Sequence, residues 1–175
     1  MRYRSISYIA SFHGILLSLK SLLDMYARLC YHLIWGKNVG RGFNKGKVKS
    51  VEISGGRVIN HLLNSCPSDY DEGEELAKVI ENHSKKWITK AIYYRDQVAH
   101  TGNIKEFLPL RVEFVKSSKS RKYKIEELME PKIDKMPIVI YADLITDNTS
   151  RFLVDSIKLL PNVDMSYLDL KEKKK

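Results

Sequence analysis

The chain has 175 residues, 43% of them hydrophobic, which is enough for one sizeable core and rather little for two. The formal net charge of +9 at pH 7 favours a polyanionic partner. The two cysteines, Cys30 and Cys66, form no CxxC or zinc-type pair, which argues against a disulfide framework and indicates a reduced, cytoplasmic protein.

The first apolar stretch is expected to be neither a signal peptide nor a membrane span. His13 interrupts it early, and Lys20, Asp24 and Arg28 follow, whereas a bilayer needs about twenty mostly apolar residues in a row. Apolar residues instead recur at spacings of three and four from about residue 5 to 35. This pattern predicts a long amphipathic helix whose apolar face is wide enough for a helix of its own chain and for a second subunit.

A segment rich in glycine and lysine follows at residues 36–49. It invites comparison with a nucleoside-triphosphate loop, but Gly42 to Val48 is one residue short and has Val48 where Ser or Thr should bind magnesium, so we reject that interpretation. We expect a mobile basic loop that touches a nucleic-acid backbone, with a solvated connector as the alternative. The cations assigned to this contact are Lys37, Arg41, Lys45, Lys47 and Lys49.

The residues after this segment lead to a second predicted long helix. Val51 to Ile53 is consistent with a short strand and residues 57–64 with a short helix. The acidic stretch at 68–75 resembles a helix start rather than a calcium loop, because the DxDxDG register fails at Gly73, and no metal site is expected. Apolar spacing then predicts a helix over 74–101, ended by Gly102 in a left-handed cap.

The pattern changes after this helix. Alternating apolar residues over about 109–126 predict a β-hairpin with a basic tip. Pro131 and Pro137 bracket a connector, and residues 141–160 are expected to form a third helix. The lysine-rich end, residues 166–175, is expected to be a disordered basic tail.

These elements predict a mainly α protein. Two long antiparallel helices, at about 5–35 and 74–101, would form a bundle with the C-terminal helix, and the hairpin would be a small addition. We expect a single domain over residues 1–165.

The end of the second long helix carries the residues best suited to chemistry. Arg95 is a permanent cation that suits phosphate, and His100 can exchange protons near neutral pH. Asp96 lies four residues before His100, so its carboxylate can reach the imidazole on the same helix face. These three residues are the candidate catalytic group.

The stretch from Arg95 to His100 resembles the motif of the HEPN superfamily, helical domains of prokaryotic toxin and defence systems. The motif is Arg, a polar residue, and His within four to six positions; the polar residue is often Asn, where this chain has Asp96. The resemblance implies a helical homodimer in which two motifs face one cleft, with RNA as the substrate and no metal or other cofactor. His100 would then be the acid or base, Arg95 would bind phosphate, and Asp96 would orient them; Tyr93 could bind phosphate or stack a base.

Other interpretations of the motif remain open. Arg95 can pair with Asp96 or with another helix's carboxylate, and His100 can interact with the helix dipole, which makes the motif structural. The same helical dimer can hold a nucleotide, RNA or a partner protein, such as an antitoxin or a nucleotidyltransferase-type protein, without catalysis. A purely structural helical protein, whose basic charge serves solubility, is the third class.

Overall fold

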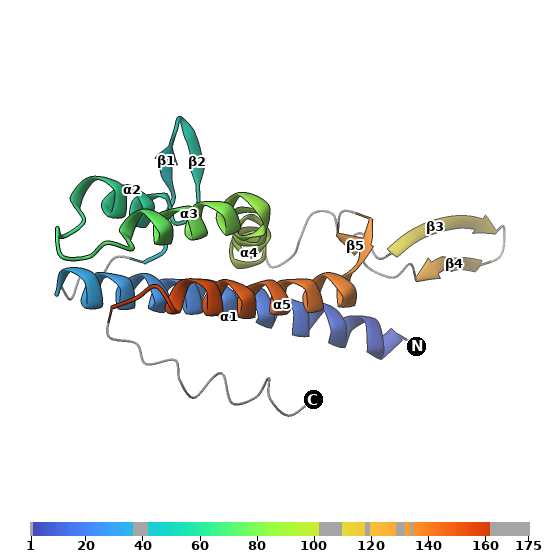
Figure 1. The fold of residues 1–175 in the computed structure, drawn as a ribbon. Coiled ribbons are helices and arrows are strands. Elements are labelled where there is room, and N and C mark those ends of the chain that lie inside the picture. Colours follow the sequence, from blue (N-terminus) through green and yellow to red (C-terminus); the bar gives the residue numbers. More distant parts are fainter. Residues whose placement is uncertain are drawn as a thin grey trace, which may run out of the picture.

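The protein is mainly helical, as the sequence predicts. The computed structural model describes residues 2–36, 42–101, 110–117, 120–128, 132–133 and 135–161, with side chains described for 9–36, 42–100, 132–133 and 135–161. The helices lie in two layers (Figure 1). One layer holds α1 (Arg2–Trp35) and α5 (Ile138–Ile157), and the other holds α2 (Gly56–Ser65), α3 (Gly73–His83) and α4 (Thr89–Thr101). The expectations for Lys37, Arg41, Gly102, the turn at 118–119 and the tail at 166–175 lie outside the described residues.

Helix α1 confirms the first predicted helix and its end. Its buried face follows the three-and-four spacing of the apolar residues: Phe12, Leu16, Leu19, Leu23, Tyr26, Ala27 and Cys30. The helix ends where Gly36 takes a left-handed φ of 61° and its N–H donates a 3.0 Å hydrogen bond to the carbonyl of His32. Glycine adopts this conformation without the steric cost that a side chain would bring.

The second predicted helix has a discontinuity that apolar spacing did not predict. Between α3 and α4, residues Ser84–Ile88 form a π-helical turn, η1, in which the Thr89 N–H bonds to the carbonyl of Ser84. A π turn of this kind adds one residue to an otherwise α-helical segment. The helical segment therefore runs over 73–101, close to the predicted bounds, but its two halves differ in rotational register.

Aromatic contacts show that α3 and α4 run antiparallel to α5. Near the start of α5, the ring of Tyr141 lies 6.0 Å from that of Tyr94 on α4. Further along α5, Phe152 lies 5.4 Å from His83 at the end of α3. Residue numbers therefore fall from α4 to α3 as they rise along α5, which is the antiparallel arrangement.

Helices α1 and α5 lie side by side and run in the same direction (Figure 1). Phe12 contacts Tyr141 at a ring separation of 5.9 Å, and Tyr26 contacts Phe152 at 4.9 Å. It follows that the long helical segment 73–101 is antiparallel to α1, which confirms the predicted arrangement. Helix α5 begins at Ile138, earlier than expected, and the buried Leu160 lies in the turn after the helix, where its N–H bonds to the carbonyl of Ile157 at 3.0 Å.

A small hairpin occupies part of the glycine and lysine segment that was expected to be a loop. Strand β1 (Gly46–Val48) pairs antiparallel with β2 (Val51–Ile53), the strand that the sequence predicted. Lys49 and Ser50 form the two-residue turn with φ angles of 48° and 71°, which matches the positive φ angles of a type I′ hairpin turn. Lys47 and Lys49 are therefore held on a hairpin.

The predicted second hairpin is also present. Strand β3 (Leu110–Ser117) pairs antiparallel with β4 (Ser120–Leu128), which confirms the hairpin expected at about 109–126. The connector bracketed by the two prolines contains a minimal pair of strands, β5 (Lys132–Ile133) and β6 (Met136–Pro137).

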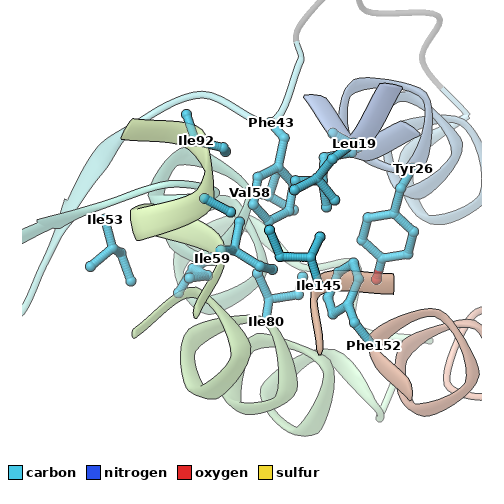
Figure 2. Packing of buried hydrophobic residues seen from close by; sticks show 14 of the residues in the cluster. Leu19, Tyr26, Phe43, Ile53, Val58, Ile59, Ile80, Ile92, Ile145 and Phe152 are labelled. Carbon is cyan, nitrogen blue, oxygen red and sulfur yellow. The ribbon is translucent and has the colours of Figure 1, made fainter. Parts of the chain in front are cut away.

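The buried side chains of the helices form one cluster. Figure 2 shows Phe43, Ile59, Ile80 and Phe152, from four different parts of the chain, in its interior. Phe43 enters it from the middle of the glycine and lysine segment, and its N–H donates a 2.7 Å hydrogen bond to Asp24 on α1. The buried ring and this bond hold the start of the first hairpin against the bundle.

Candidate active site on helix α4

Arg95 lies at the border of the buried face of α4. The neighbouring Ala91, Ile92 and Val98 are buried, whereas 29% of the Arg95 side chain is exposed. Its Nη1 donates a 3.1 Å hydrogen bond to Oδ1 of Asp96, and its buried Nε has no hydrogen-bond partner among the described side chains. The guanidinium is therefore held at the rim of the core and keeps donor capacity for a further acceptor.

Asp96 is engaged with Arg95 rather than with His100. The carboxylate is 35% exposed and accepts the bond from Arg95. Within the described part of the chain, no hydrogen bond joins Asp96 to His100, although the spacing of four residues allows one. The adjacent guanidinium is always charged, and a charge-assisted hydrogen bond to a carboxylate is stronger than one between neutral groups.

His100 is exposed in the last turn of α4. It lies five positions after Arg95, so on an α-helix the two side chains project about 140° apart. The buried face of α4 packs toward α1 and α5, and His100 projects away from it. Arg95 and His100 of one chain therefore do not converge on a single bound atom by themselves.

Tyr93 lies on the same exposed side of α4 as His100. Its side chain is 53% exposed, and its ring lies 5.6 Å from that of Tyr94, which is buried. The ring of Tyr93 is thus supported at one edge and open to solvent elsewhere. This is the geometry in which an aromatic side chain can stack on a planar ligand.

One basic residue of the first hairpin, Lys49, contacts the long helical segment. Lys45, Lys47 and Lys49 are all exposed, and Nζ of Lys49 lies 4.0 Å from Oε2 of Glu81 on α3. Glu81 also accepts a hydrogen bond from Lys85. The hydrogen bond from Lys85 lowers the pKa of Glu81. Partial burial opposes this shift, and the charge of Lys49 assists it. The carboxylate therefore stays ionised between the two lysines.

The base of the same hairpin is attached to the π turn. The Ser54 N–H, just after β2, donates a 3.1 Å hydrogen bond to Oγ1 of Thr89, the residue that follows η1. Lys85, Lys86 and Lys90 are exposed around this junction. Sequence reasoning did not select these three lysines, although their clustering within six positions just before the motif was a signal that could have done so.

The cysteines do not form a nucleophilic site. Burial raises the pKa of the Cys30 thiol to about 12, and it also raises the pKa of Cys66. Both are free thiols. Because the thiolate is the nucleophile, Cys30 is poorly suited to covalent catalysis near neutral pH.

The described residues contain no group of three or more His, Cys, Asp or Glu side chains able to hold a metal ion. Nor does any helix in the described ranges have the length and apolarity needed to cross a membrane. Among the described residues of α4, the side chains suited to acid–base or phosphate chemistry are Arg95, Asp96 and His100.

Two apolar hollows lie along the seam between α1 and α5, on the other side of this helix pair from α4. One has a volume of about 450 Å³ and includes Ile15 and Ile145 in its wall, and the other, of about 610 Å³, includes Met25 and Leu153. Leu22 lines both hollows. None of the candidate site residues lines either of them, so the motif and these hollows are separate features.

Comparison of the chain with known protein families, with curated proteins and with solved structures finds no match. The features of this chain that bear on its function are the geometry of α4 and the residues Arg95, Asp96 and His100 that it carries.

Proposed function

We propose that the protein is a metal-independent RNA endonuclease of the HEPN type. The observation that carries the proposal is the exposed His100 on the same helix as the Arg95–Asp96 pair, at the spacing of that family's motif. An imidazole exchanges protons near neutral pH, and a guanidinium stabilises negative charge on phosphate. These are the two functions that cleavage of a phosphodiester requires from side chains.

The proposed reaction uses the 2′-hydroxyl of the RNA itself. One imidazole removes the 2′-hydroxyl proton while the oxygen attacks the adjacent phosphorus, and a second, protonated imidazole gives its proton to the departing 5′-oxygen. The new bond joins the 2′-oxygen to phosphorus, and the bond from phosphorus to the 5′-oxygen breaks. The products are a 2′,3′-cyclic phosphate and a 5′-hydroxyl, so no water is consumed in this step.

Two chains supply the two imidazoles in this proposal. One chain offers a single histidine at the motif, and Arg95 and His100 project about 140° apart on α4. A homodimer whose two-fold axis passes near the C-terminal end of α4 would place the two motifs around one cleft. Arg95 would stabilise the charge of the transition state, and its bond from Nη1 to Asp96 would hold the guanidinium in position.

The resemblance also supports a biological setting. A toxin–antitoxin or phage-defence system in the cytoplasm would use such an enzyme against RNA, and an antitoxin or nucleotidyltransferase-type partner would restrain it. The net charge of +9 is compatible with RNA as the substrate.

The test is cleavage of an end-labelled structured RNA by the full chain in EDTA. His100→Ala and Arg95→Ala are compared with His32→Ala, which removes an exposed histidine of α1 far from the motif. Removing a general acid or base should lower the rate roughly 10²- to 10⁴-fold. We expect this loss for His100→Ala and a comparably large loss for Arg95→Ala, whereas His32→Ala should cut like the wild type.

The products provide a second criterion. The RNA fragments should end in a 2′,3′-cyclic phosphate, and a substrate with a single 2′-deoxy sugar at the cleavage position should resist cutting. Equal activity of folded His100→Ala and wild type, or full cutting of the deoxy substrate, would rule out the proposed mechanism.

The alternative is a non-catalytic helical dimer that binds a nucleotide, RNA or a partner protein. The observation that favours it is the engagement of Arg95 by Asp96, which gives the motif a structural role. This alternative expects salt-dependent RNA binding without cleavage, and the same affinity in His100→Ala as in the wild type.

A further inference from the structure

The first hairpin and the long helical segment form one basic surface. Glu81 of α3 lies between Lys49 of the hairpin, at 4.0 Å, and Lys85 of η1, with which it forms a hydrogen bond. One carboxylate thus faces two ammonium groups. The bond from Ser54 to Thr89 holds the other end of the hairpin at 3.1 Å from the same helical segment. The hairpin therefore has two contacts with this helical segment, a hydrogen bond from the Ser54 backbone to Thr89 and an ion pair of the exposed Lys49 with Glu81.

A line of polar and aromatic residues continues from this junction along α4. Lys85 and Lys90 are five residues apart across the π turn, and because that turn holds one extra residue, this spacing is comparable to a spacing of four in an α-helix. From Lys90, spacings of three and four lead to Tyr93, Gln97 and His100 on one side of α4. Lys85, Lys90, Tyr93 and His100 are exposed, and Gln97 is half-buried.

Helix α5 carries more acidic than basic side chains. Its exposed charged residues are Asp143, Asp147 and Arg151, and Asp155 lies 3.6 Å from His83 of α3. The described lysines of the hairpin, η1 and the start of α4 therefore form a cationic surface on one part of the bundle. A charge gradient of this kind directs a polyanion to one side of a protein.

We propose that a single-stranded RNA segment lies along this surface, from the hairpin lysines over η1 and along α4 to His100. Lys47, Lys49, Lys85, Lys86 and Lys90 hold its phosphates, and Tyr93 stacks on a base next to the phosphate that meets His100. This inference rests on the proposed RNA-cleaving function and adds to it the path of the substrate. It also assigns roles to Lys85, Lys86 and Lys90, which lie outside the motif.

The length of the path fits a short segment of RNA. From Lys85 to His100 the helical rise of 1.5 Å per residue gives about 22 Å. At a stacked spacing of about 3.4 Å per nucleotide, this distance holds roughly six nucleotides. Oligonucleotides shorter than this should bind more weakly, and longer ones should gain little within one chain.

The experiment measures the affinity of full-length protein for a fluorescent single-stranded RNA of ten nucleotides over a series of salt concentrations. All proteins carry His100→Ala, so that the RNA is not cut. Lys86→Glu and Lys90→Glu are compared with Lys158→Glu, which makes the same change of charge just after the end of α5. Each lost phosphate contact should make the slope of log K against log salt less steep by about 0.7, and should weaken RNA binding roughly five- to tenfold at 50 mM salt. Lys158→Glu should show the same slope of log K against log salt as the His100→Ala protein.

Tyr93 has its own matched pair of variants. Tyr93→Ala should weaken binding about five- to hundredfold through the lost stacking, whereas Tyr93→Phe keeps the ring and should bind like the parent. Equal weakening by both variants would assign Tyr93 a hydrogen-bonding role and overturn its stacking role.

The RNA path and the proposed nuclease function would be contradicted by different results. If protein with an intact His100 cuts RNA while the three lysine variants bind alike, the path is wrong and the nuclease function stands. If that protein neither cuts nor binds RNA, the proposed function is wrong and the path fails with it. Circular dichroism and thermal melting of each variant establish that it is folded.

Discussion

At the scale of single residues, His83 shows how burial and hydrogen bonding combine. Its Nδ1 accepts a 3.0 Å hydrogen bond from Nε1 of Trp87, and its Nε2 lies 3.6 Å from Oδ2 of Asp155. An acceptor at Nδ1 requires that nitrogen to be unprotonated, so the proton of the neutral ring is on Nε2, facing Asp155. Burial lowers the pKa of His83, and the neighbouring carboxylate of Asp155 only partly opposes this effect.

This arrangement predicts a loss of stability in mild acid. A histidine in an unfolded chain has a pKa of about 6.5, so with a lowered pKa in the folded state the unfolded chain binds more protons below that value. The free energy of unfolding should therefore fall as the pH drops below about 6.5, and should level off below the pKa of folded His83. Protonation at Nδ1 also removes the hydrogen bond from Trp87, which acts in the same direction as burial.

Urea unfolding at pH 7.5, 6.5 and 5.5 measures this effect. His83→Gln should show a weaker pH dependence than the wild type because its side chain does not titrate. Burial also lowers the pKa of His13, so part of the dependence should persist in the variant. Parallel curves for the two proteins would assign the whole effect to other groups.

At the scale of elements, the turn of the first hairpin carries two residues in a left-handed conformation. Lys49 and Ser50 have φ angles of 48° and 71°, a region that costs a residue with a side chain roughly 1–2 kcal/mol relative to glycine. Part of any gain from glycine is offset by the larger entropy that glycine loses on folding. The balance still favours glycine at the second turn position.

Ser50→Gly should accordingly raise the free energy of unfolding by about 0.5–1 kcal/mol, measured by chemical denaturation. Lys78→Gly is the matched control because it places the same residue at an exposed position inside α3, where it should destabilise by about 1 kcal/mol. A loss of stability in both variants would show that the entropy of glycine outweighs the relief at the turn.

The same hairpin shows why some elements are harder to predict than others. Helix α1 repeats its apolar spacing over many turns, so its bounds could be read from the sequence. Strand β1 has only Gly46, Lys47 and Val48, which is too short for an alternating pattern, and it pairs only because β2 follows a suitable turn. The π turn was missed because one added residue leaves spacings of three and four on both sides of it.

At the scale of the whole molecule, Phe152 joins the two layers. This fully buried ring of α5 contacts Tyr26 on α1 at 4.9 Å, Phe43 at 6.2 Å and His83 on α3 at 5.4 Å. Because the ring fills space between segments that are distant in sequence, no neighbouring side chain can move easily into the cavity left by its removal.

Phe152→Ala should lower the free energy of unfolding by about 3–5 kcal/mol, measured by urea unfolding. The matched control is Val154→Ala on the same helix, whose side chain is 53% exposed and whose truncation should change stability by less than about 0.5 kcal/mol. A small loss in Phe152→Ala would show that the layers repack without this ring.

Some features of the candidate site, like some elements of the fold, could be predicted from the sequence, and others could not. The order of Arg95, Asp96 and His100 on one helix could be predicted because local periodicity places all three. The pairing of Arg95 with Asp96, and the position of Lys49 beside Glu81, could not be predicted because they depend on rotamers and on contacts between segments.

The π turn has a consequence for how this gene can vary in length. If one residue were deleted from 84–88, the segment could close into a continuous α-helix, because the π turn holds one residue more than an α-helix needs. The later residues would keep their places, and Arg95 would stay at the rim of the core. Functional descendants of this sequence can therefore be expected to lose one residue within the turn more readily than within α3 or α4, where a deletion would rotate the buried face of the helix by about 100°.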